Sequence, residues 1–131
     1  MSTVRETFAM IAQMQPELQP GTWVFRTFSD AADAAAHIPN ALASFREDEG
    51  LSLILPANDT DDHVMRCITL HVQSALDGIG LTAAVAVALS EAKIPCNVIA
   101  AFHHDHIFVP ANMADRALSI LIARSQAERQ G

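Results

Sequence analysis

The stretch Arg66–Pro110 reads RCITLHVQSALDGIGLTAAVAVALSEAKIPCNVIAAFHHDHIFVP. A β-branched run leads into residues 77–80 (DGIG), and an alanine-rich segment with apolar residues at helical spacing follows. Two more strand-like runs come next, and the turn that joins them is expected at His103–Asp105. The stretch therefore predicts a strand, a glycine loop, a helix and a two-stranded hairpin, in that order.

The glycine loop has two interpretations. Gly78 and Gly80 can simply turn the chain tightly, which glycine does without steric cost. Alternatively the loop binds a ligand, because a helix that starts here leaves the N–H groups of Gly80, Leu81 and Thr82 free to hold a carboxylate. In that case the Thr82 hydroxyl is a further donor, and Asp77 pairs with a ligand ammonium group.

The remaining patterns predict the other elements. Residues 29–40 are ambiguous between a helix and an irregular loop, because Pro39 interrupts a run of alanines. Gly50 is interpreted as the C-cap of a helix that turns Ala41, Leu42 and Phe45 inward. Helices are expected over 4–14, 40–49, 81–92 and 112–128, and strands over 22–28, 51–55, 65–72, 97–102 and 106–109.

These elements predict three segments along the chain: an N-terminal helix and linker over 1–20, an N-terminal half over 21–63 and a C-terminal half over 64–131. The chain has 131 residues, of which 50% are hydrophobic, and this is enough for one compact unit or two small lobes that share a core. The expected fold class is α+β.

Composition narrows the functional class. The formal net charge of −7 argues against a nucleic-acid partner, which requires clustered Lys and Arg. The N-terminus has no signal-peptide pattern, and no apolar run reaches the ~20 residues of a membrane span. Cys67 and Cys96 lie in strand-like runs without metal-ligand spacing, which is typical of reduced thiols in a cytoplasmic protein.

The histidines of the hairpin are the only other candidates for chemistry. His104 and His106 share a face of an extended strand, and a metal site would need a further ligand from His71, His63 or Asp77. The alternatives are a polar turn with one functional residue and a purely structural hairpin. The acidic run 59–62 is interpreted as a solvated turn that could open a helix, rather than as a metal site.

Catalytic motifs are otherwise missing from the sequence. Neither cysteine is placed at a helix N-terminus, where its pKa would fall, and no strained nucleophile elbow surrounds Ser74 or Ser90. The segment Gly78-Ile79-Gly80 is an incomplete dinucleotide fingerprint, and no phosphate-binding P-loop occurs. We therefore expect a protein that is not an enzyme and that needs no cofactor.

The loop 77–81 (DGIGL), the helix after it and the Ile94–Val98 segment resemble the ACT domain, a small regulatory module. The hairpin 103–110 (HHDHIFVP) and the segment 45–52 (FREDEGLS) resemble more specifically a bacterial family of small stand-alone ACT-like proteins of unsettled function. That family is related to the ACT domains of the cytosolic arginine sensors. The resemblance covers residues 20–123.

The resemblance implies a ferredoxin-like β-α-β-β-α-β fold, here as two interlocked ACT-type β-α-β halves with antiparallel sheet. The C-terminal half lacks its last strand, so a strand from 22–28 or 51–55 is expected to take the vacant place beside 65–72.

The resemblance also implies function. It predicts a homodimeric regulatory protein that binds an amino acid or a similar zwitterion at a lobe or subunit interface and acts by population shift. The alternatives are a metal-binding protein or small metal-dependent enzyme that uses the His103–His106 hairpin, and an interaction module without a small ligand. The residues expected to bind the ligand are Asp77, Gly78, Gly80, Leu81, Thr82, Asn97, Val98 and Ile99.

Overall fold

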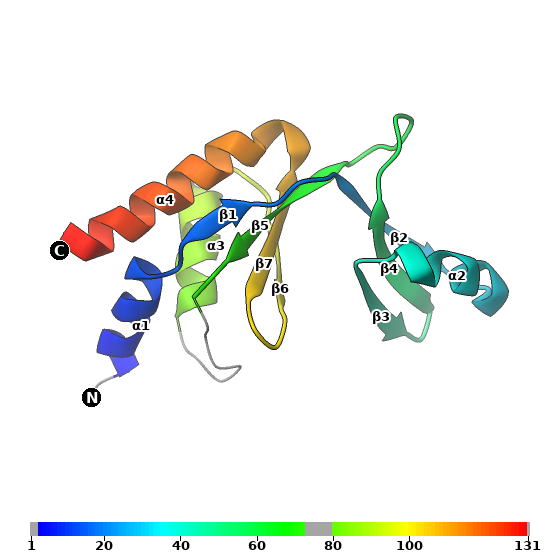
Figure 1. The fold of residues 1–131 in the computed structure, drawn as a ribbon, viewed down its shortest axis with the longest axis horizontal. Helices are drawn as coiled ribbons and strands as arrows, with labels where there is room; N and C mark the ends of the chain where they lie inside the picture. The colour runs from blue at the N-terminus through cyan, green and yellow to red at the C-terminus, as the bar shows by residue number, and fades with distance from the viewer. Residues whose placement is uncertain (1–2, 73–79, 131) are drawn as a thin grey trace. The chain divides into compact units, whose positions relative to one another are not determined.

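A computed structural model of the chain describes residues 3–72 and 80–130. The chain forms two compact units. We call residues 1–20 together with 66–131 the split unit, because two separate segments build it, and residues 21–65 the inserted unit. Both units carry antiparallel strands with helices, which confirms the predicted α+β class (Figure 1).

The sheet of the split unit runs in the order β1-β5-β7-β6. Its strands are β1 (Pro16–Leu18), β5 (Met65–Leu70), β6 (Asn97–Ala100) and β7 (Asp105–Pro110). Its α-helices are α1 (Thr3–Ala12), α3 (Leu81–Glu91) and α4 (Ala114–Gln130), and the short 3-10 helix η2 (Ala111–Met113) precedes α4. The succession β5-α3-β6-β7-α4 is five-sixths of a ferredoxin-like β-α-β-β-α-β motif.

The missing sixth element comes from the N-terminus. β1 pairs antiparallel with β5 over three residues, with Glu17 opposite Thr69. Of the strands that were expected in this place, 22–28 contributes only the pair Trp23–Met65. Sequence reasoning overlooked β1 because it is three residues long and begins with a proline, too short for an alternating pattern to be visible.

The core of the split unit lies between its sheet and its helices. Ile68, Leu70, Ile107 and Val109 project from the strands, and α1, α3 and α4 contribute the facing apolar residues. Those facing residues include Ile11, Leu81, Val85, Leu89, Ala117 and Leu121, all at most 4% exposed. Alternate strand residues therefore lie on the opposite face of the sheet, away from the helices.

The inserted unit is a three-stranded sheet in the order β3-β4-β2 with one helix. Its elements are β2 (Trp23–Phe28), α2 (Ala31–His37), the 3-10 helix η1 (Ile38–Asn40), β3 (Ala43–Glu47) and β4 (Gly50–Pro56). The ambiguous segment 29–40 is thus helical, because the Asp30 side chain caps α2 by accepting hydrogen bonds from Ala32 N and Asp33 N.

One predicted helix is wrong. The segment 40–49 contains strand β3, which forms a hairpin with β4, and Gly50 opens β4 instead of capping a helix. Leu42 and Phe45 are 51% and 71% exposed, rather than inward. A Cβ on Gly50 would lie 2.6 Å from the carbonyl oxygen of Phe28, so the position needs glycine for close approach to β2.

The predicted helix α3 is confirmed within one residue. The left-handed residue Lys93, whose φ is 61°, follows the C-cap Ala92. The N–H groups of Lys93 and Ile94 bond to the Ser90 and Leu89 carbonyls, which satisfies the end of the helix. Among the described residues, no helix is long and apolar enough to cross a membrane.

Candidate ligand-binding site

Histidines gather where β5 ends beside the β6–β7 turn of the split unit. The rings of His71 and His104 lie edge to face with centroids 5.4 Å apart, and Thr69 Oγ1 is 2.9 Å from His106 Nδ1. Thr69 and His71 are two residues apart in sequence, and their contacts His106 and His104 are two residues apart in the reverse direction. This is the pattern of antiparallel neighbouring strands. The end of β5 therefore meets the turn at 101–104, which Ala101 N closes by donating to His104 O at 3.0 Å.

Glu17 of β1 completes this cluster from the other side. It pairs with Thr69 in the sheet, and its Oε1 lies 3.3 Å from Nε2 of His71. Glu17, Thr69 and His106 occupy neighbouring strands on the face away from the helices, because Ile68 and Ile107 beside them point into the core. We call Glu17, Thr69, His71, His104 and His106 the histidine cluster.

The surroundings of His106 in the histidine cluster shift its pKa. Burial lowers the pKa of His106 from its ordinary value, and the imidazoles of His104 and His71 lower it further, while Asp105 acts in the opposite direction. These surroundings therefore favour the neutral imidazole of His106, which can both donate and accept hydrogen bonds.

The start of α3 lies at the same end of the split unit as the β6–β7 turn (Figure 1). Gly80 is the N-cap with φ of 100°, and its carbonyl accepts the first helical hydrogen bond from Ala84 N at 2.8 Å. Leu81 is buried and Thr82 is exposed. Among the described residues, no side chain caps the first N–H groups of this helix. The predicted site residues Asp77 and Gly78 lie outside the described residues.

The predicted residues of β6 are placed unevenly. Ile99 pairs with His106 and so lies next to the histidine cluster. Val98 packs on the hydrophobic core, and Asn97 pairs with Phe108, far along the hairpin from its turn. The structure therefore brings Ile99, but not Asn97, to the histidines.

Sequence reasoning missed two members of the cluster. Thr69 resembles any β-branched strand residue, and Glu17 lies in a strand too short to be predicted. Only the pairing of β1 with β5 brings Glu17 next to His71, 54 positions away in sequence. The sequence suggests a role for His71 only as a metal ligand.

The thiols lack the setting of nucleophiles. Burial raises the pKa of the Cys67 thiol, and hydrogen bonds to Thr69 and to the backbone of Ile107 offset this only partly. Burial also raises the pKa of Cys96. A raised pKa keeps the thiol protonated at neutral pH, so neither sulfur is activated for attack.

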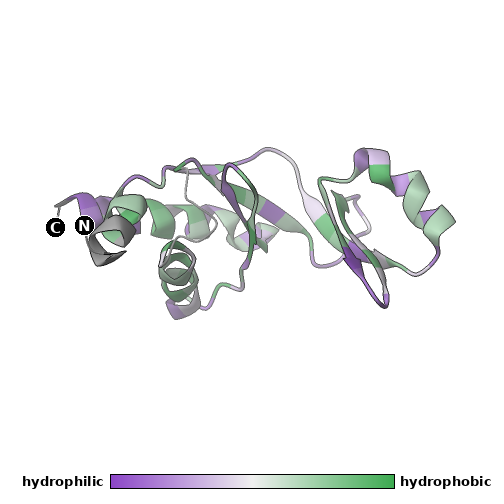
Figure 2. Cartoon of the chain, turned by 90° about the horizontal axis from the view of Figure 1, so that it is seen from below, coloured by the Kyte–Doolittle hydropathy of each residue, from purple (hydrophilic) through white to green (hydrophobic). Residues whose placement is uncertain are grey.

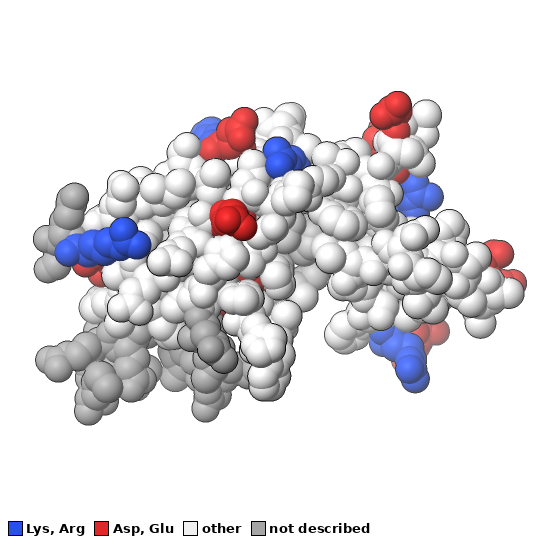
Figure 3. Space-filling view, in the orientation of Figure 1, with Lys and Arg blue, Asp and Glu red and all other residues white. Residues whose placement is uncertain are grey.

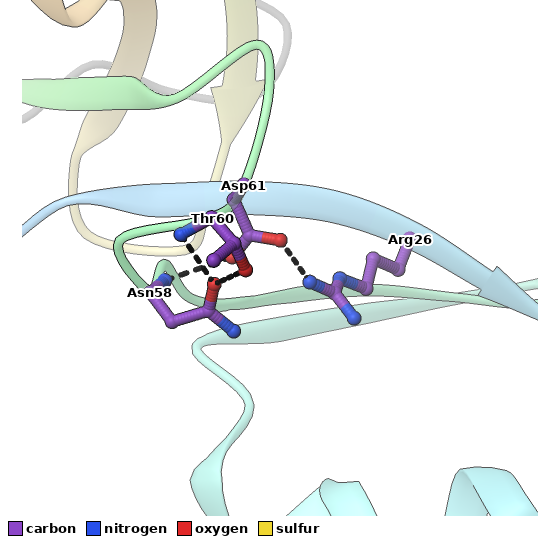
Figure 4. Close-up of polar contacts among 4 residues, drawn as sticks. All are labelled: Arg26, Asn58, Thr60 and Asp61. Atoms are coloured by element: carbon purple, nitrogen blue, oxygen red, sulfur yellow. Dashed lines mark hydrogen bonds and ion pairs between the residues drawn. The ribbon is translucent and has the colours of Figure 1, made fainter.

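The acidic turn at 57–63 belongs to the inserted unit and is a hydrogen-bonded loop, not a helix. Figure 4 shows Asn58 N donating to Asp61 Oδ2 at 2.8 Å, and Thr60 N and Oγ1 donating to Asn58 Oδ1. Asp61 also forms an ion pair with Arg26 of β2. The Asp61 oxygens are thus occupied by protein partners. Across the described ranges, no group of three or more His, Cys, Asp or Glu is arranged to hold a metal ion.

Charged side chains are scattered over the face seen in Figure 3, without a basic patch. This distribution and the net charge of −7 give no support to binding of a polyanion.

Comparison with protein families identifies the family of the chain. One model of the ACT domain matches residues 3–69, and a second matches residues 62–123. This chain belongs to the ACT-domain family. ACT domains are regulatory rather than catalytic modules, and they commonly bind small molecules and oligomerise.

Several solved structures are similar to this chain. A Vibrio cholerae protein of unknown function, described as a possible transport protein, is 39% identical with a TM-score of 0.77, over 92% of this chain and 96% of that one. An Agrobacterium tumefaciens protein is 21% identical with a TM-score of 0.64, over 84% of this chain and 87% of that one.

The same fold occurs in the ligand-free regulatory subunit of aspartate kinase from Thermus thermophilus. It is 7% identical with a TM-score of 0.62, over 86% of this chain and 97% of that one. At that identity the likeness concerns the fold alone. A search of curated proteins gave no match.

Proposed function

We propose that this ACT-domain protein is a non-enzymatic regulator that binds an amino acid or a similar small zwitterion. Binding favours one arrangement of a homodimer, and the response is a shift between populations. The observation that carries the proposal is the start of α3, where a left-handed glycine leaves the first helical N–H groups without a side-chain cap.

The start of α3 suits a carboxylate. The N–H groups of Leu81 and Thr82 precede the first intrahelical donor, Ala84, so they are available to an acceptor. The helix dipole adds positive potential there, and the exposed Thr82 hydroxyl supplies a further donor. Gly78 allows the ligand to approach the loop backbone, and Asp77 pairs with the ligand ammonium group.

The strand β6 is the second part of the proposed site. Among the described strands it pairs only with β7, so the backbone groups of β6 that point away from β7 lie along an edge of the sheet. We propose that the backbone of Asn97, Val98 and Ile99 completes the site of a neighbouring subunit. The free thiols are compatible with a location in the cytoplasm, which we adopt.

A thermal-shift screen with the amino acids identifies the ligand, and calorimetry then measures its affinity. Gly80→Val should abolish binding, because a β-branched side chain is strained at a φ of 100° and crowds the N–H groups. Gly21→Val is the matched control, since Gly21 is also left-handed, with φ of 93°, but lies in the inserted unit. Unchanged affinity in Gly80→Val would place the site elsewhere.

Asp77→Asn tests the ammonium partner. It should weaken binding of an α-amino acid by roughly 1.5–3 kcal/mol, as expected for a lost charge-assisted hydrogen bond, and weaken the deaminated analogue much less. Equal weakening of both ligands would remove Asp77 from this role. The same screen includes divalent metals, so that the metal-binding alternative and the ligand-free interaction module give distinct outcomes.

A further inference from the structure

The outward side of α3 in the split unit is apolar. Leu81, Val85 and Leu89 are buried against the sheet, whereas Val87 on the other side is 54% exposed. The only charged residue of the helix is Glu91, at its end. In Figure 2, α3 is seen nearly end-on and is green over most of its turns. Thr82 and Ser90 are exposed on a different strip of the helix from Val87. An apolar helix side is normally covered by another part of the protein or by a partner.

This outward side forms one wall of a groove, and α4 forms the other. The groove has a volume of about 540 Å³. Six of its eight lining residues are apolar, and four of those six are alanines, whose small side chains let another helix approach closely. The lining consists of Ala83, Ala84, Val87, Ala88 and Glu91 from α3 and Ile120, Ala123 and Arg124 from α4.

The two charges of the groove have opposite sign and lie apart. Glu91 precedes Ala92, whose carbonyl accepts a hydrogen bond from Arg116 Nη2 at 2.8 Å. Arg124 lies eight residues after Arg116 in α4, and eight residues span about 12 Å along a helix. Its Nη1 donates to Glu128 at 2.5 Å, and a guanidinium has further donors for a second carboxylate.

We infer that the groove between α3 and α4 is a self-complementary interface that receives the same groove of a second copy of this chain. In a two-fold dimer, residue i meets residue j and j meets i. Rotation about an axis through the groove brings Glu91 to the partner's Arg124 and Arg124 to the partner's Glu91. The two Val87 side chains then cover each other's alanine-lined wall.

A second copy suits these features better than a small molecule does. Ligand pockets place a few convergent polar groups among apolar ones, so that the ligand has one orientation. Here the two charged groups, Glu91 and Arg124, are separated and have opposite sign. Such complementary charges are typical of protein–protein interfaces. The inference names a contact between two copies through their helices, distinct from the β6 edge of the proposed function, and it does not depend on any ligand.

Sedimentation velocity of the full chain tests the interface. We expect the native protein to sediment as a dimer of twice 14.1 kDa at tens of micromolar. Glu91→Arg should weaken association by at least roughly tenfold, because like charges then face each other across the interface. The double variant Glu91→Arg/Arg124→Glu should restore the dimer, since both pairs are re-formed with reversed sign.

Val87→Asp is a second, independent variant, because it places an unpaired charge in the apolar part of the groove. Glu49→Arg in the exposed β3–β4 turn has the same charge change as Glu91→Arg and should leave the dimer intact. Circular dichroism and thermal melting verify that each variant is folded. A native monomer, or a dimer unaffected by both Glu91→Arg and Val87→Asp, would overturn the inference. Calorimetry of amino-acid binding reports on the proposed function separately.

Discussion

At the scale of single residues, several neighbours of His106 affect its pKa. It faces Thr69 across β5 and β7, its ring is partly withdrawn from water, and two further imidazoles lie near it. Glu17 contacts His71, not His106, and Asp105 is the carboxylate that favours a charged His106. The net effect is a lowered pKa, which couples protonation of this residue to folding.

The sign of the resulting pH dependence follows from that direction. As pH falls through the ordinary histidine range near 6.5, the unfolded chain takes up a proton before folded His106 does. The free energy of unfolding should therefore decrease from pH 7.5 to pH 5, and His106→Asn should reduce this decrease. Urea denaturation at several pH values measures it.

The control for this experiment is His63→Asn. His63 is exposed and has a φ of 55°, a conformation that asparagine tolerates, so this variant makes the same change of side chain outside the histidine cluster. If the free energy of unfolding changes with pH equally in the native protein and in His106→Asn, protonation of His106 is not coupled to folding.

Gly50 gives a second prediction at this scale. Gly50→Ala places a Cβ 2.6 Å from a backbone oxygen of Phe28, which cannot yield without moving β2. We expect the free energy of unfolding to fall by about 1–3 kcal/mol, the usual cost of overpacking. The neighbouring exposed substitution Glu49→Ala should change it by less than about 0.5 kcal/mol. Equal stability of the two variants would contradict the close approach.

At the scale of elements, the N-terminal segment has a structural role. Ile11 of α1 and Met14 after it are at most 2% exposed and belong to the core of the split unit. The Met14 carbonyl accepts a hydrogen bond from His71 N at 2.8 Å, and Ser125 Oγ of α4 donates to Ala12 O at 2.9 Å. Residues 1–20 therefore fold with the C-terminal half of the chain.

Ile11→Ala tests this role. It removes a fully buried side chain, so the free energy of unfolding should fall by about 2–5 kcal/mol. Phe8→Ala on the same helix should cost less, because Phe8 is 48% exposed. Thermal and urea unfolding distinguish the two. If Ile11→Ala leaves the free energy of unfolding unchanged, α1 does not pack into the core of the split unit.

The elements also show which signals are visible in sequence. The helix over 81–92 and the strands around it were predicted correctly, because their periodicity is strong and their ends carry glycine and proline. The strand β3 was mistaken for a helix, because residues 40–49 contain apolar residues at i, i+1 and i+4 that fit a helical stripe equally well. Pairing with β4 overrides this local preference.

At the scale of the whole molecule, the split unit is continuous in space although its chain is interrupted. Gln19 N donates to Cys67 O at 2.8 Å, so the chain leaves β1 and re-enters β5 at nearly the same place. Replacement of residues 21–65 by a short glycine-serine linker should therefore preserve the split unit. Circular dichroism and amide exchange of the shortened chain provide the measurement.

The fragment 66–131 alone is the informative comparison. It lacks β1 and α1, which leaves one edge of β5 unpaired and the core residues around Leu121 uncovered, so we expect it to aggregate or remain unfolded. Cooperative folding of this fragment would show that the N-terminal segment is dispensable.

The sequence by itself determined the α+β class, the ACT resemblance and the glycine-led helix, because each rests on local periodicity or on contiguous motifs. Only the tertiary structure decided that β1 completes the sheet and that Glu17, Thr69, His71, His104 and His106 share one face. The physical reason is sequence separation: Glu17 and His71 are 54 positions apart, and no local pattern encodes a three-residue strand that becomes stable only when β5 supplies its hydrogen-bond partners.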